Sequence, residues 1–247
     1  MKRIIKKNYN IYSNNNHIIK QKQQNILNML KILYSNKNII ICIKPFGVLS
    51  QKDAKGEEGL PEILAAQTGG KTIYPVHRLD RPVGGVMVYA KNSKTAASLS
   101  SENAFEKTYL AVISGCPEEN SGVLSDYLYK DGAKGKSFVV AKERKGCKYA
   151  ELEYEVLESK ETEQGELSLV KIKLHTGRTH QIRVQFASRG MPLIGDGKYG
   201  SRIKSENIGL WSHKIEINAP QNEKTQIFTA PPPSENPWSQ FDMTDLH

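Results

Sequence analysis

One aspartate of the chain is well placed to do chemistry. Asp80 lies between Arg78 and Arg81, just before a Pro-Val-Gly-Gly turn and an apolar strand predicted at Val86–Ala90. A carboxylate on a turn beside a rigid strand lies at the rim of the core, and the flanking guanidinium groups favour its ionised form. An ionised, positioned aspartate can act as a nucleophile or stabilise positive charge that develops at a sugar carbon. The alternative interpretation is a surface ion pair.

A second polar segment follows a predicted strand that ends at Leu174. Gly177 makes a turn, and a helix is predicted over residues 179–189. Ile182 and Phe186 are spaced i,i+4, so both face the core. The remaining polar side chains fall near the rim of a cleft: Arg178, Gln181 and Arg183. An arginine held there can pair bidentately with Asp80. The alternative is a phosphate clamp, which also implies nucleic-acid contact.

Tyr109 is a third candidate, on a strand predicted at Thr108–Ser114 beside Leu110 and Val112. A tyrosine in such a strand is more typical of a core position than of a catalytic one.

Two further patterns carry less weight. Gly70-Lys71-Thr72 resembles the end of a phosphate-binding loop, but a helix rather than a strand is predicted before it, so we interpret it as a turn. His175 and His180, taken with Asp196, lack the i,i+4 histidine spacing of a helical metal site. The sequence therefore favours structural or RNA-contacting roles for these histidines, and no metal.

The positive charge is concentrated in parts of the chain. The formal net charge is +9, and residues 1–52 contain ten lysines or arginines and no acidic residue, so the rest of the chain is nearly balanced. Within that rest, residues 130–148 and 178–204 form two local basic clusters. Clustered cations on a balanced domain are typical of a polyanion-binding protein. The alternative is a solvated surface.

Composition excludes several classes of protein. The 247 residues are 38% hydrophobic, which is enough for a packed core. The longest apolar run, Ile39–Ile43, is far shorter than the roughly 20 residues of a membrane-spanning helix, so no membrane is implied. No secretory signal is recognisable. The three cysteines are Cys42, Cys116 and Cys147, with no CxxC, which favours the cytoplasm over a disulfide scaffold.

The expected elements define the fold class. Strands are predicted at 38–43, 86–90, 108–114, 150–158, 167–174 and 210–217, and helices at 20–34, 59–67, 93–103 and 179–189 with Ser93 as an N-cap. Without regular βαβ alternation, this order indicates an α+β domain on a mixed, largely antiparallel sheet. The predicted parts are a basic arm at 1–37 with a short helix, a main domain at 38–232, which the resemblance described next identifies as catalytic, and an extended tail at 233–247.

Taken together, these segments resemble the RluA-type pseudouridine synthases. The resemblance covers about residues 38–232 and is carried by an ordered set of motifs: Lys44-Pro45-Phe46-Gly47, His77-Arg78-Leu79-Asp80-Arg81, Lys107-Thr108-Tyr109-Leu110-Ala111, Gly177-Arg178-Thr179-His180-Gln181-Ile182-Arg183-Val184, Met191-Pro192-Leu193-Ile194-Gly195-Asp196 and Leu210-Trp211-Ser212-His213. Three positions depart from the usual family pattern: Val83-Gly84-Gly85, Gln185 and Met191. None of these removes a predicted catalytic group.

The resemblance implies an isomerase that detaches a uracil from its ribose, rotates it and rejoins it through C5, with no cofactor and no metal. It implies that Asp80 is the nucleophile and that Arg183 is its ion-pair partner. It also implies that Tyr109 stacks on the target base and can take part in proton abstraction. Arg78 would fill the space left in the RNA when the uridine flips out. The other expected substrate-binding residues are His77, Arg81, Leu174, Arg178, His180 and Gln181. The expected fold carries a basic cleft, and the Lys-rich residues 130–148 lie where relatives have an RNA-gripping loop.

The partner expected from the sequence is ribosomal RNA or transfer RNA, and a monomer is the default oligomeric state. The basic arm would order on RNA. Two alternatives remain at this point. A non-catalytic RNA-binding or ribosome-assembly factor would use the same basic surface. A glycosidase or nucleoside hydrolase generally uses two carboxylates, whereas the sequence offers one well-placed acid.

Overall fold

The computed structural model describes residues 30–101, 104–218 and 225–244. Their strands form one eleven-stranded sheet in the order β1-β2-β4-β10-β5-β9-β8-β6-β7, with β11 paired to β10 and β3 paired to β4. The strand pairings are antiparallel, apart from the short parallel contact of β4 with β10. This mixed, largely antiparallel sheet with few helices confirms the α+β fold class predicted from the sequence.

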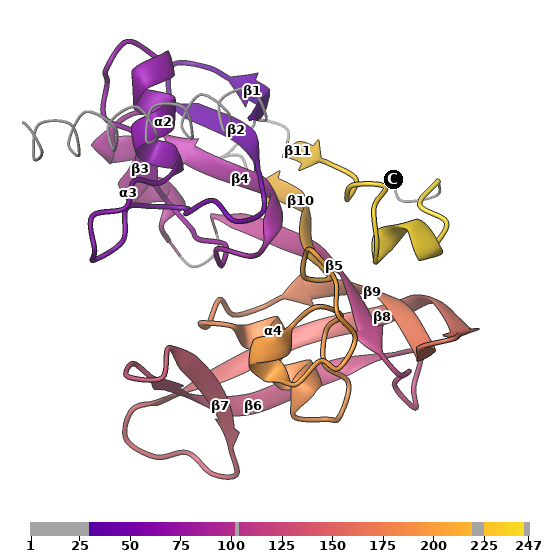
Figure 1. Ribbon diagram of the computed structural model, residues 1–247. Helices are drawn as coiled ribbons and strands as arrows, with labels where there is room; N and C mark the ends of the chain where they lie inside the picture. Colours follow the sequence, from indigo (N-terminus) through magenta and orange to yellow (C-terminus); the bar gives the residue numbers. More distant parts are fainter. Residues whose placement is uncertain (1–29, 102–103, 219–224, 245–247) are drawn as a thin grey trace, which may run out of the picture.

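The elements follow in the order shown in Figure 1. The strands are β1 (Lys31–Ser35), β2 (Ile39–Lys44), β3 (Tyr74–Pro75), β4 (Gly84–Ala90), β5 (Phe105–Ser114), β6 (Ser121–Asp131), β7 (Lys136–Val140), β8 (Cys147–Thr162), β9 (Gly165–Leu174), β10 (Leu210–Ile217) and β11 (Gln226–Thr229). The helices are α2 (Leu60–Gln67), α3 (Ser93–Leu99) and α4 (Gln181–Ala187), with 3₁₀ turns η1 (Gly197–Tyr199) and η2 (Trp238–Gln240).

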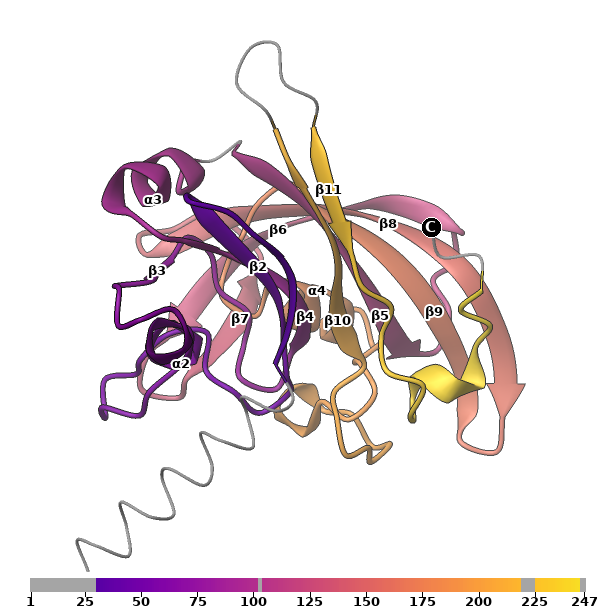
Figure 2. The same cartoon turned by 90° about the horizontal axis from the view of Figure 1, so that it is seen from above.

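The sheet is covered on both faces because its central strands are apolar on both sides. Along β2, Ile40 and Cys42 belong to one buried cluster and Ile39 and Ile41 to the other. The first cluster includes residues of α2 and α4, and the second includes residues of the C-terminal segment. Figure 2 shows the curved sheet with α2 beside β2 and the C-terminal segment close to β9.

Two glycines allow the middle of the sheet to close. β10 lies between β4 and β5, so that Ser212 is paired with Gly85 on one side and with Tyr109 on the other. Gly85 has φ +121°, and a Cβ atom there would lie 2.3 Å from the backbone oxygen of Ser212. The neighbouring Gly84 is similarly covered by the ring of Trp211. The Val83-Gly84-Gly85 departure from the family pattern therefore keeps glycine where the backbones meet.

The two turns that carry the candidate residues come from different halves of the sheet (Figure 1). Asp80 lies on the connection from β3 to β4, between α2 and α3 along the chain. Arg183 lies on α4, which follows β9 and packs against β6 and β7. The sheet thereby brings residues more than a hundred positions apart in the sequence to one cleft.

Several predicted elements differ from the structure. Residues 31–35 form β1 on the edge of the sheet rather than the end of a helix, because they pair with β2; residues 1–29 lie outside the described ranges. Residues 130–148 are not a loop: they complete the β6–β7 hairpin and begin β8. The N-cap of α3 is Asn92, whose side chain accepts from the backbone N–H of Thr95.

The segment after the Pro-Pro-Pro run is also more ordered than an extended tail. Residues 238–240 form η2, and Trp238 is 1% exposed. Trp238 and Phe241 pack into the cluster on the second face of the sheet. None of the helices among the described residues is long and apolar enough to cross a membrane.

A test of the close strand contact is Gly85→Ala. Because the added methyl group meets the backbone of Ser212 and φ is positive, we expect a loss of roughly 3 kcal/mol or more in unfolding free energy. Gly132→Ala is the matched control, since nothing lies within 4 Å of its Cβ position. Urea denaturation measures both, and equal stability of the two variants would contradict the packing described above.

Candidate active site

The predicted site residues gather around one cleft of about 760 Å³ between the two halves of the sheet. It is lined by every predicted site residue except Arg81: His77, Arg78, Asp80, Tyr109, Leu174, Arg178, His180, Gln181 and Arg183. Arg81 instead pairs with Glu57 at 2.8 Å and donates from Nε to the carbonyl of Gly47. The structure therefore does not bring Arg81 to the cleft, and its role is to fasten the turn after Asp80.

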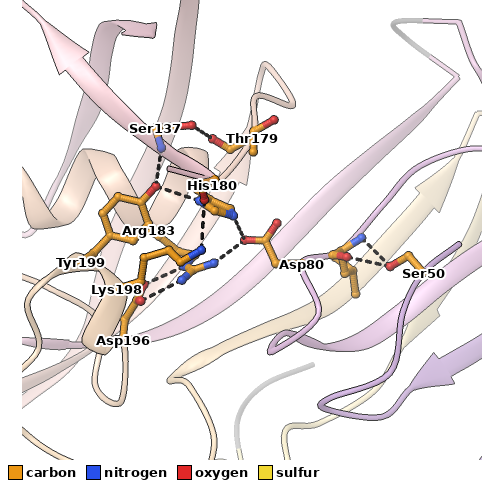
Figure 3. Close-up of polar contacts among 11 residues, drawn as sticks. Ser50, Asp80, Ser137, Thr179, His180, Arg183, Asp196, Lys198 and Tyr199 are labelled. Carbon is orange, nitrogen blue, oxygen red and sulfur yellow. Dashed lines mark hydrogen bonds and ion pairs between the residues drawn. The ribbon is translucent and has the colours of Figure 1, made fainter. Parts of the chain in front are cut away.

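Two buried side chains fix the backbone on either side of Asp80. The Ser50 hydroxyl donates to the carbonyl of Leu79 at 2.7 Å and accepts from its N–H at 3.0 Å (Figure 3). Lys44 is 0% exposed, and its Nζ donates to the carbonyls of Val48 at 2.6 Å and Arg81 at 3.2 Å. Burial lowers the pKa of Lys44 to about 7, and the charge of Asp80 opposes this effect.

Arg183 joins two carboxylates. Its Nη1 donates to Oδ2 of Asp80 at 2.8 Å, while Nε and Nη2 donate to the two oxygens of Asp196 at 2.7 and 2.8 Å (Figure 3). Burial opposes the charge of Arg183, but hydrogen bonds and charges from Asp196 and Asp80 raise its pKa. The predicted contact with Asp80 is present, but the bidentate pairing expected there is wrong: the fork of Arg183 is occupied by Asp196.

The carboxylate of Asp80 is left with one oxygen available. Oδ2 accepts from Arg183 and lies 3.6 Å from Nε2 of His180. Oδ1 has no hydrogen-bond partner among the described residues, and Asp80 lines the cleft. The charge partner of Asp80 is therefore Arg183, not the flanking Arg81, and the free oxygen is suited to nucleophilic attack.

Tyr109 contributes an aromatic wall. It is 5% exposed, belongs to the core cluster and lines the cleft. Burial and then the charge of Asp80 raise its pKa, with a hydrogen bond to Ser212 opposing. The phenol is therefore neutral and a poor proton acceptor. The core position of Tyr109 is confirmed, and its stacking on a base stays a prediction.

The other cleft residues differ in whether their side chains already make hydrogen bonds within the protein. Gln181 is 3% exposed, and its amide is used within the turn: Oε1 accepts from Thr176 and Arg178, and Nε2 donates to Glu151. Arg78, by contrast, is exposed and has no hydrogen bond or ion pair with another described residue. Arg78 is thus available to a ligand, whereas Gln181 braces the loop that presents Arg183.

His77 and Lys107 lie at the side of the cleft. Nε2 of His77 accepts from the N–H of Val88 at 3.1 Å, and burial lowers the pKa of His77 to about 3, with Lys107 reinforcing the effect. Lys107 lies over the ring of Phe105 at 5.2 Å, and burial lowers its pKa too. His77 is accordingly neutral, which favours a structural role over an ionic contact with RNA.

Several functional residues escaped the sequence interpretation. Ser50 and Lys44 act through backbone carbonyls, which no spacing rule reveals, although Lys44 stands in one of the family-like motifs. Asp196 was weighed as a metal ligand, but both of its oxygens hold Arg183. Tyr199 lies in the segment Gly197-Lys198-Tyr199-Gly200, and its sequence context gives no sign of function beyond its closeness to the motif that ends at Asp196. No cluster of potential metal ligands occurs in residues 30–101, 104–218 and 225–244.

The charge around the cleft suits a polyanion. Its basic residues are Lys52, Arg78, Lys107, Lys130, Arg178 and Arg183, and its acidic residues are Asp53 and Asp80. A positioned carboxylate with a free oxygen, an aromatic wall and a cationic rim define a site that acts on a nucleotide within a nucleic acid.

Comparison with known proteins identifies the family. A family model described as RNA pseudouridylate synthase matches residues 38–188. The chain therefore belongs to the RNA pseudouridylate synthases, a family of isomerases that act on uridines of RNA, which confirms the class predicted from the sequence motifs.

Three relatives illustrate the range of the family. The chain is 36% identical over 200 residues to an uncharacterized RNA pseudouridine synthase of Aquifex aeolicus, covering 76% of this chain but 62% of that protein. It is 31% identical to the ribosomal large subunit pseudouridine synthase D of Borreliella burgdorferi (78% and 62% covered). It is 32% identical to the tRNA pseudouridine synthase C of Yersinia pestis (88% and 93% covered).

A solved structure supports the fold. Human RNA pseudouridylate synthase domain containing 4 superposes with a TM-score of 0.69 at 21% identity, covering 88% of this chain and 93% of that one. At this identity the likeness shows the architecture.

The buried neutral histidine predicts a pH dependence of stability. An unfolded histidine has a pKa near 6.5, so the unfolded chain binds one more proton at His77 than the folded chain between about pH 6.5 and 3. Stability is therefore full above pH 6.5 and falls on acidification, by about 1.4 kcal/mol per pH unit from this one proton. In His77→Gln, urea denaturation at pH 7, 5.5 and 4.5 should show that contribution removed. His175→Gln, at an exposed histidine, is the control; a wild-type slope in both variants would contradict the assignment.

Proposed function

We propose that this chain converts specific uridines of structured RNA to pseudouridine, with Asp80 as the nucleophile. The observation that carries the proposal is the geometry of Asp80: Oδ2 is held by Arg183, while Oδ1 is free and the residue lines the cleft. A uridine inside a duplex cannot reach such an oxygen, so the target nucleotide must flip into the cleft. The cleft volume of about 760 Å³ accommodates one nucleoside.

The reaction is an isomerisation. The N1–C1′ bond of the uridine breaks, the uracil turns in the cleft, a C5–C1′ bond forms, C5 loses its proton and N1 gains one. Asp80 either attacks C1′ directly or acts in a route through a glycal, in which the C2′ proton removed on elimination returns when the C5–C1′ bond forms; both routes need an ionised carboxylate. No redox step occurs, so neither route calls for a cofactor or a metal.

Arg183 and Tyr109 have complementary roles in this proposal. Arg183 holds one oxygen of Asp80 through a hydrogen bond from Nη1. Tyr109 offers a flat apolar surface to the detached uracil, which keeps the base in place while it turns. Because its hydroxyl stays protonated, it also adds no negative charge beside Asp80.

The cationic residues of the rim bind the RNA. Arg78 fills the space that the flipped uridine vacates, and stacking there offsets part of the cost of extrusion. Arg178, Lys107 and Lys130 are placed to meet phosphates. His77, Leu174, His180 and Gln181 complete the substrate-binding wall by shape and by holding these groups in place.

The names of the relatives support ribosomal RNA and transfer RNA as the substrate classes. One relative is named for the large ribosomal subunit and another for tRNA. The three cysteines of the chain are unpaired, which suits the reducing cytoplasm where these RNAs are made. A monomer provides the whole proposed site, since every residue in it comes from one chain.

The alternatives are less well supported. A non-catalytic RNA-binding factor has no need of a carboxylate braced by Arg183 beside an aromatic wall. A glycosidase needs a second carboxylate that can activate water, but Asp196 is 2% exposed and both of its oxygens are engaged by Arg183.

Replacement of the nucleophile tests the proposal directly. In Asp80→Asn, tritium release from C5 of uridine in unmodified ribosomal and transfer RNA should fall to background, because an amide cannot attack C1′. RNA affinity should persist, since Asp196 still holds Arg183. Asp242→Asn, on the C-terminal segment, is the control. Undiminished release by Asp80→Asn would refute the proposed chemistry.

A second test concerns the flipped state. Arg78→Gln should slow the reaction about tenfold more on a structured target than on a short unstructured oligonucleotide with the same uridine, because stacking is lost only where a helix must be filled. Arg202→Gln is the matched control, since Arg202 is exposed and lies outside the cleft. Single-turnover rates on the two substrates measure this difference. An equal loss of rate on both substrates would contradict the gap-filling role of Arg78.

A further inference from the structure

A chain of polar contacts runs from the β6–β7 hairpin to Asp80. The backbone N–H of Ser137 on β7 donates to the hydroxyl of Tyr199 at 2.8 Å. The same hydroxyl lies 2.8 Å from Nδ1 of His180, and Nε2 of His180 lies 3.6 Å from Oδ2 of Asp80. Figure 3 shows these residues pointing toward one another from separate segments of the chain.

The donors in this chain fix where the protons lie. The hydroxyl of Tyr199 already accepts from Ser137, and its own proton needs an acceptor in a site where Tyr199 is 8% exposed. Nδ1 of His180 is its partner among the described residues. Burial lowers the pKa of His180, opposed by Asp80 and reinforced by Arg183 and Lys198, so the ring is neutral. A neutral ring that accepts at Nδ1 carries its proton at Nε2, facing Asp80.

The backbone of His180 is held in an unusual conformation for this purpose. His180 is the only non-glycine residue with positive φ (56°) among the described residues, at the start of α4. Such a conformation persists only where the surroundings impose it. Here Ser137 also donates from its hydroxyl to the carbonyl of Thr179 at 2.7 Å, directly before His180. The hairpin therefore holds both the backbone and the ring of His180.

The ring of Tyr199 is fixed independently of its hydroxyl. Nζ of Lys136 lies 4.9 Å from the centroid of the Tyr199 ring, and Cζ of Arg183 lies 5.1 Å from the same centroid. Lys198, next to Tyr199, donates to the carbonyl of Gly135 in the hairpin turn at 3.0 Å. Removal of the hydroxyl alone should therefore leave the ring and the docked hairpin in place.

We propose that His180 and Tyr199 are positioning residues: Tyr199 fixes the tautomer of His180, so that Nε2–H faces Oδ2 of Asp80 at 3.6 Å and biases that oxygen electrostatically, with the other oxygen left for the target. This deepens the proposed function and rests on it. The hairpin carries much of the basic cluster at 130–148, so RNA that binds the hairpin also bears on the orientation of the nucleophile. His180 turns an N–H rather than a lone pair toward Asp80, which distinguishes it from a general base.

The proton position is measured without any substrate. Nitrogen-15 NMR of the histidine rings in the full chain should show the Nε2–H tautomer for His180, assigned by its disappearance in His180→Asn. In Tyr199→Phe that preference should weaken or be lost, because the hydroxyl that selects it is gone. An Nδ1–H tautomer in the wild type, or no change in Tyr199→Phe, would overturn the proposal.

Single-turnover kinetics test the consequence for Asp80. Tyr199→Phe should lower the rate at saturating RNA about tenfold with RNA affinity unchanged, as expected for a lost hydrogen bond that orients a charged group. Tyr154→Phe is the control, since that hydroxyl contacts the carbonyl of Glu119 outside the cleft. An unchanged rate in Tyr199→Phe would overturn the positioning role.

Two substitutions of His180 separate positioning from backbone effects. Asparagine tolerates positive φ better than glutamine, but its amide reaches only the place of Nδ1. Glutamine can place an N–H near Nε2, so His180→Gln should react faster than His180→Asn. The reverse order would show that the backbone conformation alone matters. Failure of the wild type to release tritium from any RNA would instead refute the proposed function, while the tautomer measurement still decides the hydrogen-bond chain.

Discussion

The guanidinium of Arg183 lies between two carboxylates, and the site depends on that arrangement. A buried charge is costly to remove from water, and loss of one partner of such a pair costs about 3–5 kcal/mol. Arg183 is 4% exposed, yet Asp196 meets two of its nitrogens and Asp80 a third. Asp196 thus provides most of the compensation for the buried positive charge of Arg183. Asp80 can then remain partly open to the cleft without destabilising the arginine.

The two halves of the sheet also share the task of positioning the site. The half with β2 and β4 fixes the backbone of the Asp80 turn through Ser50 and Lys44, and the half with β6 to β9 supplies Arg183 and His180. The glycines at the β4–β10 contact let the halves approach. Each half is built from local packing, but the carboxylate is oriented only where they meet.

The sequence predicted those elements and site residues that depend on local residue patterns alone. The strand at Leu210–Ile217 and the helix that ends at Gln67 follow from the spacing of their apolar residues. Asp80 and Arg183 stand out in the sequence because each lies at or just after a predicted turn. Pairing partners were beyond such rules. Residues 31–35 and the Lys-rich residues 136–140 are strands because β2 and β6 lie beside them, although their own composition suggests a helix and a loop. Asp196 and Lys44 were underrated because burial and carbonyl partners arise from the tertiary fold.

The arrangement also explains why a site with one free carboxylate suits isomerisation rather than hydrolysis. Hydrolysis needs a second acid or base to activate water, and Asp196, the carboxylate closest in function, is fully used by Arg183. Under the proposed function, Arg183 holds the nucleophile while the ring of Tyr109 keeps the detached uracil beside the same sugar carbon.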